Sequence, residues 1–160
     1  MSVTTDKQDY APGETARITA IVTPGGRLEI TVLHLDLPGA DGIYGTADDI
    51  LDATLNGLSA DHAPVFAIDG GPGDADGLAN GVVVYEWYVN PDDSLGERFR
   101  VAVREVTEGP DGKLGTADDG QVGPTEYATF TDALPPPIQT YYVPLPEDDL
   151  DVSFGVIDSS

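Results

Sequence analysis

The sequence predicts an all-β protein, a sandwich of two antiparallel sheets, and three observations support that prediction. Apolar and polar residues alternate at the period of a β-strand in many short segments. The 19 glycines and 13 prolines are spread along the chain, which indicates many turns rather than one linker. No segment has a convincing helical period; residues 47–58 come closest, but Gly57 and alternating polarity weaken the pattern. We expect roughly seven to nine strands separated by turns.

In the first half of the chain, turns separate most of the expected strands. Two of these turns are residues 9–14 (DYAPGE) and 24–26 (PGG). His34 lies on the apolar face of the longest strand, where a histidine is more often a core residue than a ligand, and His62 falls in an expected turn. The strands expected here are 3–8, 15–23, 27–37, 50–55 and 63–68.

The second half contains the most apolar expected strand. Residues 81–89 (GVVVYEWYV) are predicted to lie in the centre of a sheet, with Trp87 in the core. In residues 97–106, alternation places Phe99 on one face and Arg98, Arg100 and Arg104 on the other. The strands expected in this half are 81–89, 97–106 and 125–131.

After residue 132 the composition changes, and this change sets the expected domain boundaries. Residues 1–133 form the sandwich, and residues 134–137 are a proline-rich spacer in polyproline form. Residues 138–160 are too apolar for a solvated linker and too short to fold alone. We expect this tail to dock on the sandwich, to begin a neighbouring module, or to add a strand to another molecule.

Composition restricts the partners. The 7 basic residues face 29 acidic ones, giving a formal net charge of −22, so nucleic acid and anionic membranes are poor partners. The absence of cysteine excludes disulfides and thiol catalysis. No apolar run approaches membrane-spanning length and no signal peptide is visible; we expect a segment of a longer chain, with Met1 added. The alternative interpretation of the acidity is that it maintains solubility or marks a halophilic source.

One nonapeptide occurs twice and carries the functional prediction. Residues 41–49 (DGIYGTADD) recur 70 positions later as residues 111–119 (DGKLGTADD), with seven of nine positions identical. Each copy holds three carboxylates, which repel one another unless a cation lies between them. Because the ligand set contains oxygen and neither sulfur nor histidine, calcium is favoured over magnesium.

The repeat also predicts the ligands. In the first copy, Asp41 with Asp48 or Asp49 would face one centre once Gly42 and Gly45 fold the backbone back, and Ile43 would offer its carbonyl. Because only the backbone carbonyl would bind the ion, Lys113 can stand in the second copy where Ile43 stands in the first. Equivalent ligands in the second copy are Asp111, Lys113, Asp118 and Asp119.

Several further residues enter this prediction. Thr46 and Thr116 are expected to hold the turns through side-chain to backbone bonds. Asp36 or Asp52 would complete the first ligand set, and Glu108 the second. The alternative is a pair of acidic hairpin turns that bind nothing.

A third loop, residues 69–80, gives a weaker signal. Its Asp74-Ala-Asp76-Gly77 run, with Asp69 five residues earlier, is the only Asp-x-Asp-Gly pattern of this kind in the chain. We include Asp69, Asp74 and Asp76 as candidate metal ligands. The alternative is a flexible glycine-rich loop.

Several segments carry a family resemblance over roughly residues 3–133. They are TDKQDYAPGET (5–15), YEWYVNPDDSLGE (85–97), FRVAV (99–103) and ATFTD (128–132). They resemble the opening and closing strands of bacterial immunoglobulin-like modules, which occur in large, repetitive, secreted surface proteins and adhesins. The resemblance implies an immunoglobulin-like sandwich and an extracellular or cell-surface location. The acidic loops depart from the plain module, and they lack the flanking helices and final glutamate of the twelve-residue helix–loop–helix calcium loop.

The sequence therefore predicts a non-enzymatic, calcium-stabilised structural or adhesion module. No nucleophile elbow or phosphate-binding glycine loop is present, and the two histidines are far apart in sequence. Expected partners are neighbouring modules, other copies of the chain, and a cell-surface glycan or protein. If the strand order is that of an immunoglobulin sandwich, the two calcium loops lie at opposite ends. Two alternatives are a self-assembling extracellular filament subunit joined through its tail, and a carbohydrate-binding accessory module of a secreted enzyme.

Overall fold

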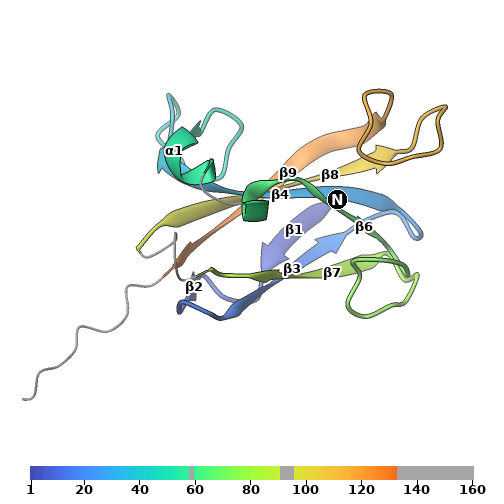
Figure 1. Cartoon of the computed structure of the whole chain (residues 1–160), viewed down its shortest axis with the longest axis horizontal. Helices are drawn as coiled ribbons and strands as arrows, with labels where there is room; N and C mark the ends of the chain where they lie inside the picture. Colours follow the sequence, from blue (N-terminus) through green and yellow to red (C-terminus); the bar gives the residue numbers. More distant parts are fainter. Residues whose placement is uncertain (58–59, 91–95, 133–160) are drawn as a thin grey trace, which may run out of the picture.

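The computed structural model describes residues 1–57, 60–90 and 96–132, and within them the chain forms nine strands in two layers (Figure 1). The expected spacer and tail, 134–137 and 138–160, lie outside the described residues. The strands are β1 (Ser2–Thr5), β2 (Asp9–Tyr10), β3 (Thr15–Ile21), β4 (Arg27–Leu37), β5 (Ile50–Leu51), β6 (Val65–Ile68), β7 (Val82–Tyr88), β8 (Arg98–Thr107) and β9 (Gly120–Asp132). Two short helices, α1 (Ala53–Asn56) and a 3-10 turn (Ala60–His62), lie between β5 and β6.

The strands form a small sheet and a large one. The small sheet has the order β1-β3-β7, and the large sheet has the order β2-β9-β8-β4, with both β5 and β6 paired to β4. The all-β prediction is confirmed, but the sheets are not purely antiparallel, because β2 runs parallel to β9. A single apolar core lies between the layers and takes Ile18 and Trp87 from the small sheet and Ile30, Phe99 and Phe130 from the large one.

Two predictions about individual elements are wrong. The apolar strand β7 lies at the edge of the small sheet rather than in a centre. The 69–80 loop lies along the free edge of this strand, where the Ala75 amide donates to the Val84 carbonyl and the Asp74 side chain accepts from the Val84 amide. The expected strand 50–55 ends at Leu51, because the carboxylate of Asp52 accepts two backbone amides and caps α1.

Residues of α1 and of the 3-10 turn bond to the middle of the β4 edge, between the parts paired to β5 and β6. The Asn56 side chain bonds both the amide and the carbonyl of His34, and His62 Nδ1 lies 2.9 Å from the Val32 carbonyl. The burial expected of His34 and Trp87 is confirmed. His62 is buried as well, and its ring lies 4.6 Å from that of His34.

Register places the two acidic loops at opposite ends of the large sheet. Arg27 at the start of β4 pairs with Val106 near the end of β8, and Leu35 pairs with Arg98 at the other end. The loop after β4 and the loop after β8 therefore leave the sheet at opposite poles, as expected. The chain begins beside the second loop, where β1 pairs with the end of β3, and β9 ends beside the first.

Candidate metal centre

The first acidic loop folds around its own carboxylates. Asp41 Oδ1 accepts from the amide of Ile43 (2.9 Å), and Asp48 Oδ2 accepts from the amide of Asp41 (3.1 Å). Asp49 Oδ2 accepts from the amides of Gly45 (2.8 Å) and of the following threonine (3.1 Å). The prediction that Gly42 and Gly45 fold the backbone back is confirmed, since both residues have positive φ.

The second loop repeats this network bond for bond. Asp111 Oδ1 accepts from the Lys113 amide (2.9 Å), and Asp118 Oδ2 accepts from the Asp111 amide (3.0 Å). Asp119 Oδ2 accepts from the amides of Gly115 (2.6 Å) and of the following threonine (3.3 Å). Two nearly identical short sequences thus form the same hydrogen-bond network although different strands precede them.

The structural repeat starts two residues before the nonapeptide. Gly39 and Gly109 have φ of 77° and 69°, and a Cβ there would lie 2.2 and 2.3 Å from the carbonyl oxygens of Asp48 and Asp118. Only glycine allows the two ends of each loop to approach so closely. Sequence reasoning missed this pair, although both glycines stand at the same 70-residue offset as the nonapeptides.

A threonine hydroxyl stands at the centre of the oxygen atoms in each loop. Thr116 Oγ1 lies 2.5 Å from Asp118 Oδ1, 3.1 Å from Asp119 Oδ1 and 3.2 Å from the Lys113 carbonyl. A hydroxyl has one proton, so it can donate to only one of these three oxygens at a time. In the part of the chain that the structure describes, Asp111, Asp118 and Asp119 are the one group of three acids that each offer a carboxylate oxygen within 4.8 Å of the other two.

The same arrangement in the first loop confirms the predicted turn-holding bond of the threonine. Thr46 Oγ1 lies 3.1 Å from the Ile43 carbonyl and 2.7 Å from Asp48 Oδ1. The side chain of Ile43 points outward and is 60% exposed. Hydrogen bonds from the threonine hydroxyl and a loop amide lower the pKa of Asp48, and the corresponding bonds lower that of Asp118. Both groups are therefore charged at neutral pH.

The additional acids proposed for these sites make other contacts. Asp52 caps α1, and Glu108 forms an ion pair with Arg27 (3.0 Å). Asp36 is exposed near the end of β4. Their role as ligands stays a prediction.

The third loop uses its acids to hold backbone amides. Asp69 Oδ2 accepts from the amides of Gly25 (2.8 Å) and Gly81 (2.7 Å). Burial alone would raise the pKa of Asp69, but these backbone donors outweigh it and the pKa is lowered. Asp74 accepts from the amides of Gly70 (2.9 Å) and Val84 (3.0 Å).

The remaining candidate in that loop, Asp76, accepts from the Leu78 amide (2.8 Å) and the Asn80 side chain (3.2 Å). The three carboxylates thus accept hydrogen bonds from different parts of the backbone. Metal binding by Asp69, Asp74 and Asp76 stays a prediction.

A positively charged side chain from β8 lies against the first loop, and sequence reasoning missed it. Arg100 of β8 donates from Nη1 to the Thr46 carbonyl (2.8 Å), and the same nitrogen lies 3.9 Å from Asp49 Oδ2. The arginine side chain is only 10% exposed and lies over the ring of Tyr127, 4.8 Å from its centroid. Residue alternation placed Arg100 on the face of β8 opposite Phe99, but it gave no sign of which loop lies over that face.

Comparisons with family models and with curated protein sequences gave no match to this chain. No helix in the described ranges has the length and apolar character needed to cross a bilayer.

Proposed function

We propose that this chain is a non-enzymatic structural module of immunoglobulin-like topology, stabilised by calcium in its two acidic loops. The observation that carries the proposal is a pair of oxygen-lined loops with nearly the same sequence and the same internal hydrogen bonds, at opposite ends of one sandwich. Each loop lies beside a point where the chain enters or leaves the fold. A cation there would stiffen the junction with a neighbouring module, as an extracellular or cell-surface repeat protein requires.

Strand order supports the finer topology. The small sheet β1-β3-β7 corresponds to the A, B and E strands of an immunoglobulin sandwich, and the β9-β8-β4 path corresponds to G, F and C. The opening segment divides between the layers, since β1 joins the small sheet and β2 joins the large one.

The donor set supports calcium. In the second loop, the carboxylates of Asp111, Asp118 and Asp119, the Lys113 carbonyl and the Thr116 hydroxyl would hold the ion. Calcium accepts six to eight oxygens in flexible geometry, whereas magnesium demands a near-ideal octahedron and dehydrates reluctantly. The residues of the first loop that would serve are Asp41, Ile43, Thr46, Asp48 and Asp49.

Calorimetric titration and thermal melting test the proposal. We expect calcium to bind with a dissociation constant of roughly 0.1–1 mM, the range of extracellular modules. At about ten times that constant, each site should add about 1.4 kcal/mol to the free energy of unfolding and raise Tm by several degrees.

Matched variants make this test specific. Asp118→Asn should remove the second-loop calcium heat, whereas Glu126→Gln, which removes one charge from β9 outside both loops, should leave it unchanged. A melting curve that is identical in calcium and in chelator at physiological salt would refute the calcium proposal.

A further inference from the structure

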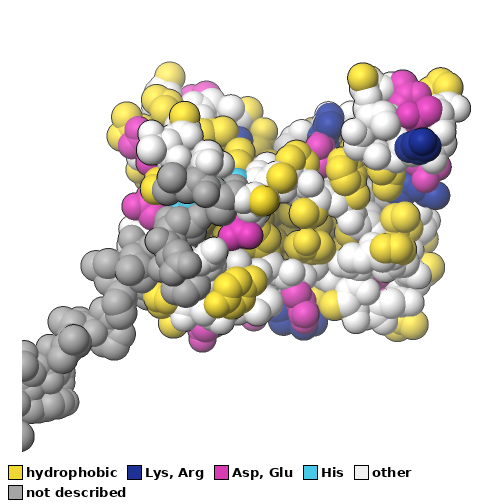
Figure 2. Space-filling view, in the orientation of Figure 1, with side chains coloured by type: hydrophobic (Ala, Val, Ile, Leu, Met, Phe, Trp, Pro, Cys, Tyr) yellow, Lys and Arg dark blue, Asp and Glu magenta, His cyan; other side chains and the backbone are white. Residues whose placement is uncertain are grey.

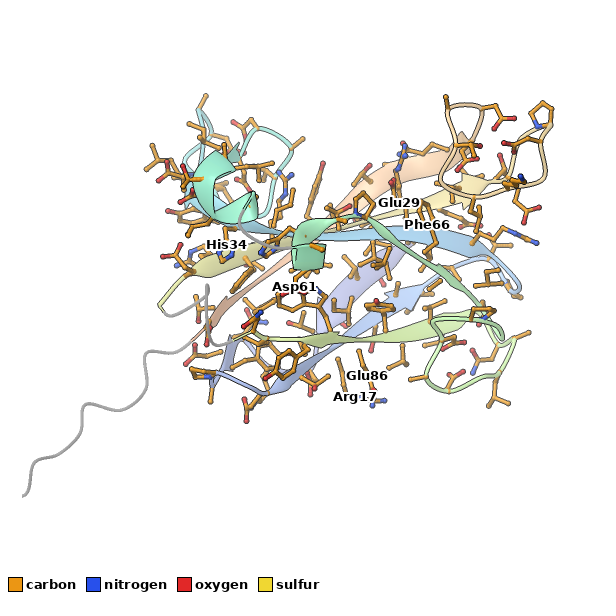
Figure 3. The ribbon with its side chains drawn as sticks, in the orientation of Figure 1. Arg17, Glu29, His34, Asp61, Phe66 and Glu86 are labelled. Carbon is orange, nitrogen blue, oxygen red and sulfur yellow. The ribbon has the colours of Figure 1, made fainter. Side chains whose placement is uncertain are left out.

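A cavity of about 340 Å³ lies between the second acidic loop and the outer face of the large sheet. Its walls come from four separate parts of the chain: β4, the start of β6, β8 and the loop. The residues that line it are Glu29, Pro64, Phe66, Arg104, Gly115, Thr116 and Asp119. Figure 3 shows Glu29 and Phe66 close together on the sheet below the loop, and Figure 2 shows the two loops as projections on either side of a saddle. The volume is within the range of small-ligand pockets.

The first loop provides an internal template for this cavity. Because β4 and β8 are antiparallel, a local twofold axis passes between Thr31 and Ala102, which lie directly opposite each other. These two residues are 71 positions apart, which is close to the 70-residue offset of the loops. Under this relation Glu29 corresponds to Arg100. Their partners on the next strands, Phe66 and Thr129, then correspond as well.

Loop contacts verify the correspondence. Gly45 of the first loop approaches Thr129, and Gly115 of the second loop approaches the Phe66 ring, since a Cβ on either glycine would lie 3.1 Å from that neighbour. The same relation matches Pro64 with Tyr127. The cavity at the second loop is therefore the place that the Arg100 guanidinium fills at the first loop.

The acceptors that hold that guanidinium are present again at the cavity. The Thr46 carbonyl accepts both the Asp49 amide and Arg100, whereas the Thr116 carbonyl accepts only the Asp119 amide within the described residues. Asp119 is also more exposed than Asp49. Arg104, the one arginine lining the cavity, bonds Glu29 and Gln121 rather than the loop.

We propose that this cavity binds an arginine side chain presented by a partner protein. The guanidinium would donate to the Thr116 carbonyl and lie against Asp119 and Glu29, with Phe66 and Pro64 beside its plane. A planar, delocalised cation fits such a site better than a compact ammonium. The strongly negative charge of the chain would favour the approach of a basic partner.

Nuclear magnetic resonance titration of the full chain with N-acetyl-arginine amide tests this proposal. The amide signals of Gly115 and Thr116 should shift with a dissociation constant of about 1 mM. N-acetyl-citrulline amide, which has the same shape without the charge, should cause no shift, and the lysine analogue should bind several-fold more weakly. Titrations with and without calcium are needed because Asp119 belongs to both the loop and the cavity.

Three variants make the outcome decisive. Glu29→Arg should fill the cavity from within and abolish the shifts, while Arg100→Ala should open the equivalent space so that Gly45 and Thr46 shift too. Absence of binding in both calcium conditions, equal binding of the citrulline analogue, or unchanged binding by folded Glu29→Arg would overturn the proposal. Binding only after Arg104→Gln would also overturn it, by showing that Arg104 occupies the site.

Discussion

The two acidic loops have the same fold and the same internal hydrogen bonds, yet they lie in different electrostatic surroundings. Arg100 reaches under the first loop and contacts Thr46 and Asp49, whereas Glu29 occupies the corresponding place beside the second. Asp49 is 8% exposed, and its counterpart Asp119 is half-buried at an open cavity. The short sequence therefore determines loop conformation, while residues distant in sequence determine the charge that each loop experiences.

This difference has a consequence for cation binding. A guanidinium close to the first loop already neutralises part of its charge and repels a second cation, whereas beside the second loop Arg104 is ion-paired with Glu29 and the pair carries no net charge. Under the proposed function, the second loop should therefore bind calcium more tightly than the first.

The largest effect should come from the glycine that begins each structural repeat. Gly39→Ala and Gly109→Ala should each lower the free energy of unfolding by about 2–4 kcal/mol, because a Cβ would collide with a loop carbonyl at a positive φ. Urea denaturation measures both variants. Gly42→Ala is the matched control, since it has positive φ but no atom within 4 Å, and should cost about 1 kcal/mol. Equal losses at positions 39 and 42 would show that the close approach is unimportant.

Removing the arginine should make the two loops alike. In chelator, Arg100→Met should lower the free energy of unfolding by about 1–2 kcal/mol, because the Thr46 carbonyl loses a charged donor and Asp49 its nearby cation. In calorimetry, the calcium affinity of the first loop should rise about tenfold toward that of the second. If the ratio of the two loops' calcium affinities stayed unchanged, the guanidinium would not be the cause of their difference.

A smaller effect concerns acid stability and should be common to both loops. The pKa values of Asp48 and Asp118 are lowered in the fold, so their charged forms stabilise it. This contribution is complete above the ordinary value of 3.8 and is lost as pH falls through the lower folded value. Thr46→Val and Thr116→Val should raise the respective pKa, which carboxyl carbon titration by magnetic resonance can follow. Lowered pKa values that persist in both variants would contradict the role of the hydroxyl.

The smallest effect should follow the exchange of the variable side chains. Ile43→Lys and Lys113→Ile alter residues whose side chains point away from the loop oxygens. Calorimetry should find calcium affinity changed by less than about threefold, in the direction set by the added or removed charge. A larger change would indicate that these side chains, rather than their carbonyls, face the ion.

The sequence by itself determined what depends on near neighbours along the chain. The 27–37 strand, the burial of His34 and Trp87, the outward face of β8 and the shared conformation of the loops all follow from residue alternation or from a short repeat. Calcium binding was inferred from the same short repeat, and it stays a prediction. The missed helix at Ala53–Asn56 shows how one capping carboxylate, Asp52, can redirect a short segment.

Only the tertiary structure decided which distant groups meet. It placed apolar β7 at a sheet edge beside the 69–80 loop, brought the His34 and His62 rings together, and put Arg100 under one loop and Glu29 beside the other. These outcomes depend on strand register and on how loops fold over a sheet. A repeat can specify its own backbone bonds twice, but the charges around each copy come from residues on other strands, and their positions are set by packing.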